Sequence, residues 1–372
     1  MKSAAFSNGV NMFYYLYLLR SYFSGLNIFR YISFRSAMGG LSAFLLSLCL
    51  TQLLIKYLRI HKVGEQIRDK KDFALYDNFQ HKQGTPSMGG VAIISSVVIT
   101  TLFWADIFNP YIRLSILAII YLGMIGFADD YLKFMRKNSK GLRARLKFLA
   151  QIILGIIMGV IFYLDPAIDH HMEVPFFKGI FFDLGIFYVI FSTLVVVGSS
   201  NAVNLTDGLD GLAIGCITMA ALAYTGMCYI TGNAKLSHYL MVSFIPGAGE
   251  LTVFCAALVG ASLGFLWHNC YPASIFMGDT GALALGGVIG LVALIIKKEL
   301  LLVVVGGIFV VEAFSVILQV TSFRWRKKRI FLMAPLHHHF QLKGLSEPKV
   351  IVRFWIVAAI CALLSLATLK IR

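Results

Sequence analysis

The stretch NAVNLTDGLDG, from Asn201 to Gly211, is polar and lies between two apolar runs that are each long enough to cross a bilayer. It contains Asn204, Asp207 and Asp210. A helix that starts near Thr206 would place both carboxylates on one face. The stretch therefore predicts either a ligand site between two membrane helices or a helix start whose free N–H groups are capped by Asn or Asp.

The composition around this stretch indicates a membrane protein. The chain has 372 residues, of which 58% are hydrophobic and 14% charged, and its mean hydropathy is +0.79. So few polar residues cannot cover the surface of a soluble globule. We predict an all-α polytopic membrane protein.

A window of bilayer thickness finds ten candidate spans. They are 38–55, 87–105, 111–128, 148–164, 184–203, 212–230, 251–267, 281–296, 300–323 and 350–369. The eighth is short and the ninth long, so either a boundary is misplaced or the ninth helix is bent. We expect a single ten-helix transmembrane domain over residues 38–372.

Basic residues concentrate in alternate connections between these spans. Seven Lys or Arg residues follow span one, seven follow span three and seven follow span nine, while the other connections hold far fewer. The positive-inside rule makes the basic connections cytoplasmic and places both termini outside. The net charge of +15 therefore reflects topology and attraction to anionic lipid headgroups, and it does not indicate nucleic-acid binding.

Residues 1–37 do not have the pattern of a cleaved signal peptide, because Arg20, Arg30 and Arg35 interrupt every apolar run. Their many aromatic residues predict a segment that lies at the membrane interface. The six cysteines of the chain are scattered without CxxC spacing. They predict small apolar packing residues and indicate neither a disulfide framework nor a metal site.

Five polar clusters fall on the predicted cytoplasmic side, although the basic connections alone determined that side. They are HKQGTPSMGG (81–90), FADD (127–130), NLTDGLDG (204–211), FMGDTGA (276–282) and PLHHHF (335–340). Their convergence predicts one site at the cytoplasmic membrane face.

The predicted site combines helix N-termini, lysines and carboxylates. The N-termini of spans two, six and eight, beside Lys82, Lys133 and Lys147, favour a multiply anionic ligand such as a diphosphate. Carboxylates would repel that ligand unless a divalent cation intervened, and the cluster has five: Asp129, Asp130, Asp207, Asp210 and Asp279. Such oxygen donors predict Mg²⁺.

Single residues of these clusters allow other interpretations. Adjacent carboxylates at a membrane boundary are costly, so Asp129 and Asp130 favour function over solvated helix caps. Asp279 could simply cap span eight. The residues 337–339 are three histidines without a Cys or carboxylate at zinc-ligand spacing, so contacts to phosphate or sugar are favoured over zinc. Glu312 lies mid-span and predicts a structural pair with a neighbouring helix.

The clusters HKQGTPSMGG, FADDYLK, NAVNLTDGLDG, FMGDTGALALGG and PLHHHF together resemble the phospho-N-acetylmuramoyl-pentapeptide-transferase family. This family belongs to the polyprenyl-phosphate N-acetylhexosamine-1-phosphate transferases. The resemblance extends from about Lys56 to the C-terminus, and residues 1–37 are longer than the family requires. HKQGTPSMGG and the uninterrupted triple histidine favour the muramoyl-pentapeptide branch over the N-acetylglucosamine branch.

The resemblance implies a reaction in peptidoglycan synthesis. UDP-N-acetylmuramoyl-pentapeptide and undecaprenyl phosphate would give undecaprenyl-diphospho-N-acetylmuramoyl-pentapeptide (lipid I) and UMP, with Mg²⁺ as cofactor. The family further implies a homodimer in the bacterial inner membrane, with the active site facing the cytoplasm. A direct displacement by the acceptor phosphate is preferred to an aspartyl-phosphate intermediate, because it needs no unmasked nucleophile.

The resemblance also implies a role for each matching residue. The catalytic set is Asp129, Asp130, Asp279 and His338, with Asp279 as the metal ligand. The nucleotide and substrate set is Lys82, Lys133, Asn204, Asp207, Asp210, Asn269, Phe276, His337 and His339. Within it, Phe276 would stack on uracil, and the lysines would lie near phosphates or uridine.

Two other functions fit parts of the pattern. A transferase that uses UDP-N-acetylglucosamine would share the metal and nucleotide chemistry and differ in sugar recognition. A transporter or lipid flippase could also have ten spans with polar clusters. Against the transporter, the charges lie at one face, whereas secondary transporters usually bind substrate near the midplane.

Overall fold

The computed structural model describes residues 13–61, 82, 84–136, 141–165, 171–173 and 181–370. Two residues of the first polar cluster, His81 and Gln83, lie outside this part of the chain. Most of the basic connection after the first span also lies outside it. The other clusters fall within the described residues.

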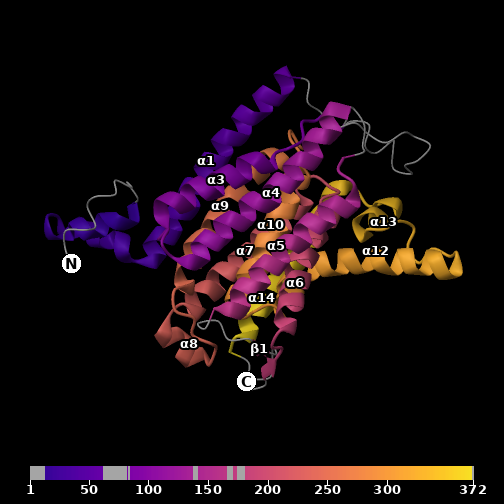
Figure 1. The fold of residues 1–372 in the computed structure, drawn as a ribbon. Helices are drawn as coiled ribbons and strands as arrows, with labels where there is room; N and C mark the ends of the chain where they lie inside the picture. Colours follow the sequence, from indigo (N-terminus) through magenta and orange to yellow (C-terminus); the bar gives the residue numbers. More distant parts are fainter. Residues whose placement is uncertain are drawn as a thin grey trace.

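Helices dominate the described chain, and they are arranged as one bundle (Figure 1). The membrane-length helices are α1 (Ile32–Ile60), α4 (Pro110–Arg136), α5 (Ala144–Leu164), α6 (Phe187–Thr206), α7 (Leu212–Thr231), α9 (Leu251–Asn269), α10 (Gly278–Ile295), α12 (Gly307–Arg326) and α14 (Glu347–Thr368). Shorter ones are α3 (Gly90–Trp104), α8 (Ala234–Leu240), α11 (Leu302–Val305), α13 (Leu336–Leu342), and the 3₁₀ helices η2 (Phe13–Ser21), η3 (Ser24–Arg30) and η5 (Ala248–Glu250). The strands β1 (His171–Glu173) and β2 (Phe181–Asp183) form an antiparallel hairpin.

Nine of the ten predicted spans each overlap one helix, and the ninth in chain order overlaps two, α11 and α12. Within the described residues, nine helices are long and apolar enough to cross a membrane, and α3, at 15 residues, is the shorter tenth. The predicted all-α polytopic membrane fold is therefore confirmed. The side of the membrane that each end of the bundle faces stays a prediction.

The ninth span is divided in two, which agrees with the bent helix, one of the two alternatives that its length left open. Helix α11 ends before Gly306, and α12 begins at Gly307 and runs across the direction of the other helices (Figure 1). Two adjacent glycines place no side chain at the bend. A Cβ on Gly307 would lie 3.0 Å from the Sγ of Cys361 on α14, so the bend also lets α12 approach α14 closely.

The N-terminal segment packs against the start of the bundle. Helix α1 begins at Ile32, six residues before the predicted start of the first span. The ring centroid of Phe13 lies 4.9 Å from that of Trp104, and the ring of Phe29 stacks on Trp104 at 6.1 Å. These contacts anchor η2 and η3 beside the end of α3.

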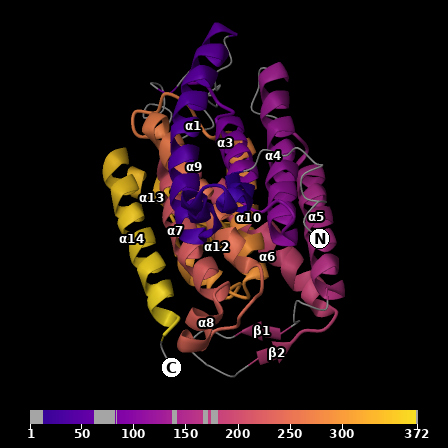
Figure 2. The ribbon, with the colours of Figure 1, turned by 90° about the vertical axis from the view of Figure 1, so that its left-hand side faces the viewer.

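A buried ion pair fastens the same end of the bundle. Arg35 at the start of α1 donates two hydrogen bonds to the carboxylate of Glu250, at 2.7 and 2.6 Å, and a third to the carbonyl oxygen of Trp104 at 3.1 Å. Bidentate arginine–carboxylate geometry is the strong form of this interaction. Helix α8 and the hairpin β1–β2 lie together at one end of the bundle (Figure 2).

Helix α10 is the centre of the bundle. Of its membrane-spanning window 89% is buried, against 22% for α12 and 28% for α1. It packs against α3, α4, α6 and α7. Glycines allow the close approach: a Cβ on Gly90 would lie 2.1 Å from the backbone N of Gly281, and one on Gly126 would lie 2.2 Å from the carbonyl oxygen of Asp279.

We expect Gly126→Ala to destabilise the protein by about 1–3 kcal/mol, because the new methyl group meets backbone that must move. The apparent melting temperature in detergent measures the effect. Gly198→Ala on α6 is the matched control, since nothing lies within 4 Å of a Cβ there. Equal melting temperatures for the two variants would contradict the packing of α4 against α10.

Candidate active site

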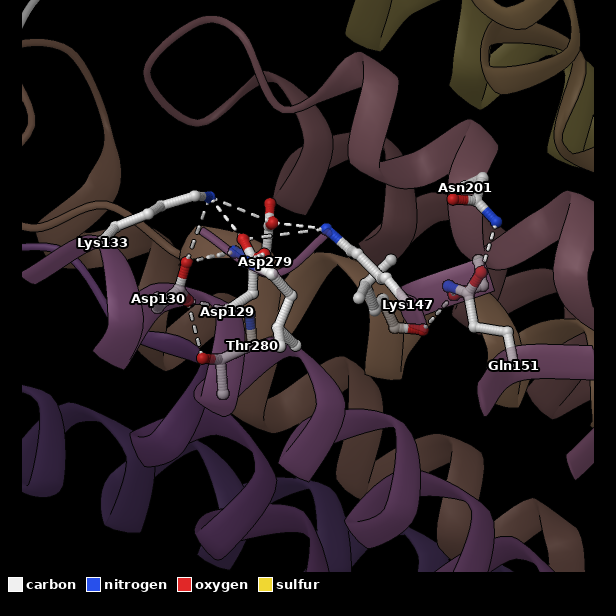
Figure 3. A network of polar contacts seen from close by, with 11 residues as sticks. Asp129, Asp130, Lys133, Lys147, Gln151, Asn201, Asp279 and Thr280 are labelled. Atoms are coloured by element: carbon white, nitrogen blue, oxygen red, sulfur yellow. Dashed lines mark hydrogen bonds and ion pairs between the residues drawn. The ribbon is translucent and has the colours of Figure 1, made fainter. Parts of the chain in front are cut away.

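Three aspartates from two helices meet at one end of the bundle. Asp129 and Asp130 lie near the end of α4, and Asp279 lies in the first turn of α10 (Figure 3). One carboxylate oxygen from each lies within 4.8 Å of the others. The backbone allows this because Gly278 has a φ of +73° and a Cβ there would lie 2.5 Å from Oδ2 of Asp130.

Asp130 caps the N-terminus of α10. Its carboxylate accepts hydrogen bonds from the backbone N–H of Asp279 at 3.2 Å, from the N–H of Thr280 at 3.0 Å and from the Thr280 hydroxyl at 2.7 Å. A carboxylate at a helix N-terminus satisfies free donors and interacts favourably with the helix dipole. Asp279 does not provide this cap itself, so the alternative interpretation of Asp279 as a simple helix cap is wrong.

Two lysines form ion pairs with the aspartates. Nζ of Lys133 lies 2.7 Å from Oδ2 of Asp129 and 3.1 Å from Oδ2 of Asp279. Nζ of Lys147, on α5, lies 2.5 Å from the same oxygen of Asp279. Three carboxylates against two ammonium groups leave one net negative charge. A buried, oxygen-only donor set with residual negative charge fits a hard divalent cation.

Lys147 was predicted beside the anionic ligand, although the resemblance implied no role for it, and the structure places it at the aspartates. Its position in the first turn of α5 points its ammonium group at the start of α10 (Figure 3).

The Asn201 side chain lies in the neighbouring network, where its Nδ2 donates to Oε1 of Gln151 at 2.8 Å. Helices α5, α6 and α10 are thus joined beside the aspartates.

The stretch from Asn201 to Gly211 is not the start of a helix. Helix α6 continues to Thr206, and α7 begins only at Leu212. The prediction that Asp207 and Asp210 share a helix face is therefore wrong. Gly211, with a φ of +75°, is the N-cap residue of α7 and offers no capping side chain, so the capped-start alternative is wrong as well. Asn204 in the last turn of α6 and Asp207 after it are both half-buried.

A second network of buried charged side chains involves Asp210 in the connection between α6 and α7. Nζ of Lys82 lies 2.6 Å from Oδ1 of Asp210 and 2.5 Å from Oε1 of Glu347. Sequence reasoning did not single out Glu347, because it precedes the predicted tenth span, which began at Val350. In the structure it is the first residue of α14.

The same network holds the connection between α9 and α10, which carries Phe276. Oδ2 of Asp210 accepts a hydrogen bond from the N–H of Ala273 at 3.0 Å. Asn269 donates to the carbonyl oxygen of Ile275 at 2.8 Å and accepts from the N–H of Gly211 at 3.1 Å. Asp210 and Asn269 are therefore placed to fix this connection.

The other side of the Phe276 connection is bonded to the start of α3. The N–H of Phe276 donates to the carbonyl oxygen of Pro86 at 2.8 Å, and its own carbonyl oxygen accepts from the N–H of Gly89 at 2.9 Å. Two predicted clusters that are far apart in the sequence, 81–90 and 276–282, are thereby joined through their backbones.

The histidine cluster forms the short helix α13. Glu312 of α12 accepts hydrogen bonds from the backbone N–H of Leu336 at 2.7 Å and of His337 at 3.1 Å, so it caps α13. The structural role predicted for Glu312 is confirmed, with the N-terminus of α13 as its partner. His337 is fully buried, and a Cβ on Gly208 would lie 2.3 Å from its Nε2.

The other two histidines lie nearer the surface. Nδ1 of His338 donates to Oε1 of Gln341 at 2.9 Å, and Nδ1 of His339 accepts from the N–H of Leu332 at 3.1 Å. Burial and the neighbouring His337 lower the pKa of His338 to about 3. His338 is therefore a neutral imidazole at physiological pH and can offer a ligand hydrogen bonds but no positive charge.

Known proteins resemble this chain over nearly its whole length. The profile of Glycosyl transferase family 4 matches residues 112–297, and the Phospho-N-acetylmuramoyl-pentapeptide-transferase signature 1 matches residues 82–94. Proteins called phospho-N-acetylmuramoyl-pentapeptide-transferase are 49% identical in Citrifermentans bemidjiense and 50% identical in Desulforapulum autotrophicum. Each alignment covers 97% of this chain and 100% of the relative.

The chain belongs to the phospho-N-acetylmuramoyl-pentapeptide-transferase family. A further member, from Thermodesulfovibrio yellowstonii, is 50% identical over 96% of this chain and 99% of its own length. Because the alignments cover so much of the chain, most of residues 1–37 lie within the length that the family shares. The expectation that these residues extend beyond the family is therefore wrong.

The lowered pKa of His338 predicts that the stability of the folded protein depends on pH. The unfolded chain takes up a proton at His338 below about pH 6.5, whereas the folded protein does not until about pH 3. Stability is therefore present above pH 6.5 and falls as the pH drops below it, by about 1.4 kcal/mol per pH unit from this residue.

The His338→Asn variant should show a weaker loss of melting temperature between pH 7 and pH 5 than the wild type. The exposed His238 on α8 supplies the control variant, His238→Asn, which should follow the wild type. Superimposable curves for wild type and His338→Asn would mean that His338 is protonated in the folded protein.

Proposed function

We propose that this chain transfers phospho-N-acetylmuramoyl-pentapeptide from UDP to undecaprenyl phosphate, giving lipid I and UMP. The observation that carries the proposal is the meeting of Asp129, Asp130 and Asp279 with Lys133 and Lys147 at one end of a membrane bundle. Relatives with nearly half of their residues identical carry the name of this transferase over their full length. The signature at residues 82–94 supports the muramoyl-pentapeptide branch.

The place of the site supports a reaction between a lipid and a soluble nucleotide. Asp129 and Asp130 directly precede one of the basic connections, and the positive-inside rule supports a cytoplasmic position for this end. Undecaprenyl phosphate would approach from the bilayer and UDP-N-acetylmuramoyl-pentapeptide from the cytoplasm of a bacterium. As a family property we also expect a homodimer in the inner membrane.

Asp279 and Asp129 would hold Mg²⁺. The oxygens of Asp130 already accept hydrogen bonds from α10 and the Thr280 hydroxyl, so its role is to fix the position of Asp279. When bound, Mg²⁺ neutralises the diphosphate of the donor and the departing UMP. The predicted catalytic role of Asp130 thus becomes, in this proposal, a positioning role.

The residues of the chain supply charge and geometry for a direct displacement. An oxygen of the acceptor phosphate bonds to the sugar-proximal phosphorus, the bond from that phosphorus to the bridging oxygen breaks, and UMP leaves with this oxygen. Lys133 and Lys147 would orient the diphosphate, because their ammonium groups lie at the same carboxylate of Asp279. The acceptor phosphate has a second pKa near ~6, so Asp129 has little deprotonation to perform and mainly positions it.

The donor would extend from the aspartates toward the connections around Phe276 and Asp207. Phe276 would stack on uracil, and the half-buried Asn204 and Asp207 would contact the nucleotide. Neutral His338 and its neighbour His339 on α13 would contact phosphate or sugar by hydrogen bonding.

The proposal is tested by UMP release from purified protein in detergent with undecaprenyl phosphate and Mg²⁺. We expect release with UDP-N-acetylmuramoyl-pentapeptide, its loss in EDTA, and none with UDP-N-acetylglucosamine. Release with only the glucosamine donor would assign the chain to the sister branch. No release with either donor, from protein shown to be folded, would overturn the transferase proposal.

Asp279→Asn should lower kcat by at least about 100-fold, because it removes a charged metal ligand from the cluster. The melting temperature should change little, since Asp130 still caps α10. Asp183→Asn on the distant hairpin is the matched control and should keep wild-type turnover. Full activity of Asp279→Asn at limiting Mg²⁺ would remove this residue from the metal site.

A further inference from the structure

Glu347 is a buried carboxylate that joins three separate parts of the chain. Its Oε1 lies 2.5 Å from Nζ of Lys82 and accepts a hydrogen bond from the backbone N–H of Asp210 at 3.0 Å. Lys82 precedes α3, Asp210 lies between α6 and α7, and Glu347 begins α14. One oxygen atom thus holds two polar clusters that the sequence separates by more than a hundred residues.

The three charged groups are almost completely removed from solvent. The exposed fractions are 6% for Lys82, 4% for Asp210 and 9% for Glu347. Two carboxylates share one ammonium group, so the triad has one net negative charge. Buried charges persist only when hydrogen bonds and opposite charges compensate them, and removing one partner leaves the others uncompensated. This arrangement orients the ammonium group of Lys82 inward, toward the carboxylates.

The triad is connected to the predicted uracil residue. Asp210 accepts on one oxygen from Lys82 and on the other from the N–H of Ala273, three residues before Phe276. The Phe276 backbone in turn is bonded to Pro86, four residues after Lys82. Glu347 therefore supports both sides of the connection that presents Phe276.

The N-terminus of α14 strengthens this support. Glu347 lies in the first turn of α14, where a carboxylate interacts favourably with the helix dipole. Trp355, two turns further along α14, donates from Nε1 to the carbonyl oxygen of Gly211 at 3.2 Å. Helix α14 thus binds the α6–α7 connection at Asp210 and again at Gly211.

We propose that Glu347 is a positioning residue for the UDP-linked donor, acting through Lys82 and Asp210 on the connection that carries Phe276. This inference rests on the proposed function, because it specifies how the donor site of the transferase is held. Glu347 itself touches neither of the reacting phosphates in this proposal. Its loss should weaken donor binding and leave the acceptor and the chemical step largely unaffected.

The experiment measures kcat and both KM values for Glu347→Gln, which keeps the size and an oxygen acceptor but removes the charge. We expect the donor KM to rise about tenfold, as for the loss of one charge-assisted hydrogen bond. The acceptor KM and kcat should stay within about twofold, because an interaction made equally in the ground state and the transition state changes KM alone.

Two further variants separate positioning from a general structural role. Glu299→Gln is the matched control, because Glu299 is equally buried in the connection between α10 and α11 and, among the described residues, neither of its oxygens has a hydrogen-bond partner. It should keep all three constants. The double variant Asp210→Asn, Glu347→Gln should have a donor KM close to that of Asp210→Asn alone, since the two carboxylates act as one unit.

An unchanged donor KM in Glu347→Gln would overturn the inference, as would an equal rise of both KM values or additive effects in the double variant. If Glu347→Gln does not fold, Glu347→Asp gives the same readout, because it keeps the charge but moves it away from the Asp210 N–H. Turnover by the wild-type protein distinguishes failure of the proposed function from failure of the role proposed for Glu347. Its absence would refute the proposed function, whereas normal wild-type turnover with an unaffected variant would refute only the role of Glu347.

Discussion

The hydrogen bonds from the N-terminus of α10 to Asp130 are the interaction on which the site depends. Helix α10 is buried along most of its length, and the free backbone N–H groups of its first turn need hydrogen-bond partners. Asp130 supplies them from α4. Because Asp130 holds the backbone of the first turn of α10, it also fixes the position of Asp279 beside Asp129. A helix-packing requirement thus assembles the aspartate cluster.

The packing around α10 follows from the same constraint. Apolar side chains gain little from leaving lipid for a protein interior, so helices in a membrane associate through close packing and hydrogen bonds. Gly90 and Gly126 let α3 and α4 approach the backbone of α10 closely. Polar groups then join the helices at one end, through Gln151 and Asn201 on one side and through Lys82, Asp210 and Glu347 on the other. Hydrogen bonds and ion pairs thus join the helices around the aspartate cluster.

Much of this could be predicted from the sequence, and the exceptions have physical reasons. The five polar clusters were predicted to converge because all of them fall on the side of the membrane that the basic connections predict to be cytoplasmic. Glu312 was predicted to be structural, and it caps α13. The helix expected at Thr206 failed because Gly208 and Gly211 favour a turn, and the positive φ of Gly211 ends any helical continuation. Glu347 could not be recognised, because a lone acid before an apolar run shows nothing of the lysine and the backbone N–H that it contacts.

The sequence by itself determined the class of the protein and the places of its apolar helices, and it predicted that the polar clusters meet at one end of the bundle. Hydropathy and charge decide these properties residue by residue, through the cost of placing polar groups in hydrocarbon. Only the tertiary structure decided what each polar residue does. Asp129, Asp130 and Asp279 are the same residue type, yet Asp130 caps a helix, whereas Asp129 and Asp279 pair closely with lysines. That difference arises largely from which helix lies opposite each carboxylate, because α10 donates to Asp130 and α5 brings Lys147 to Asp279.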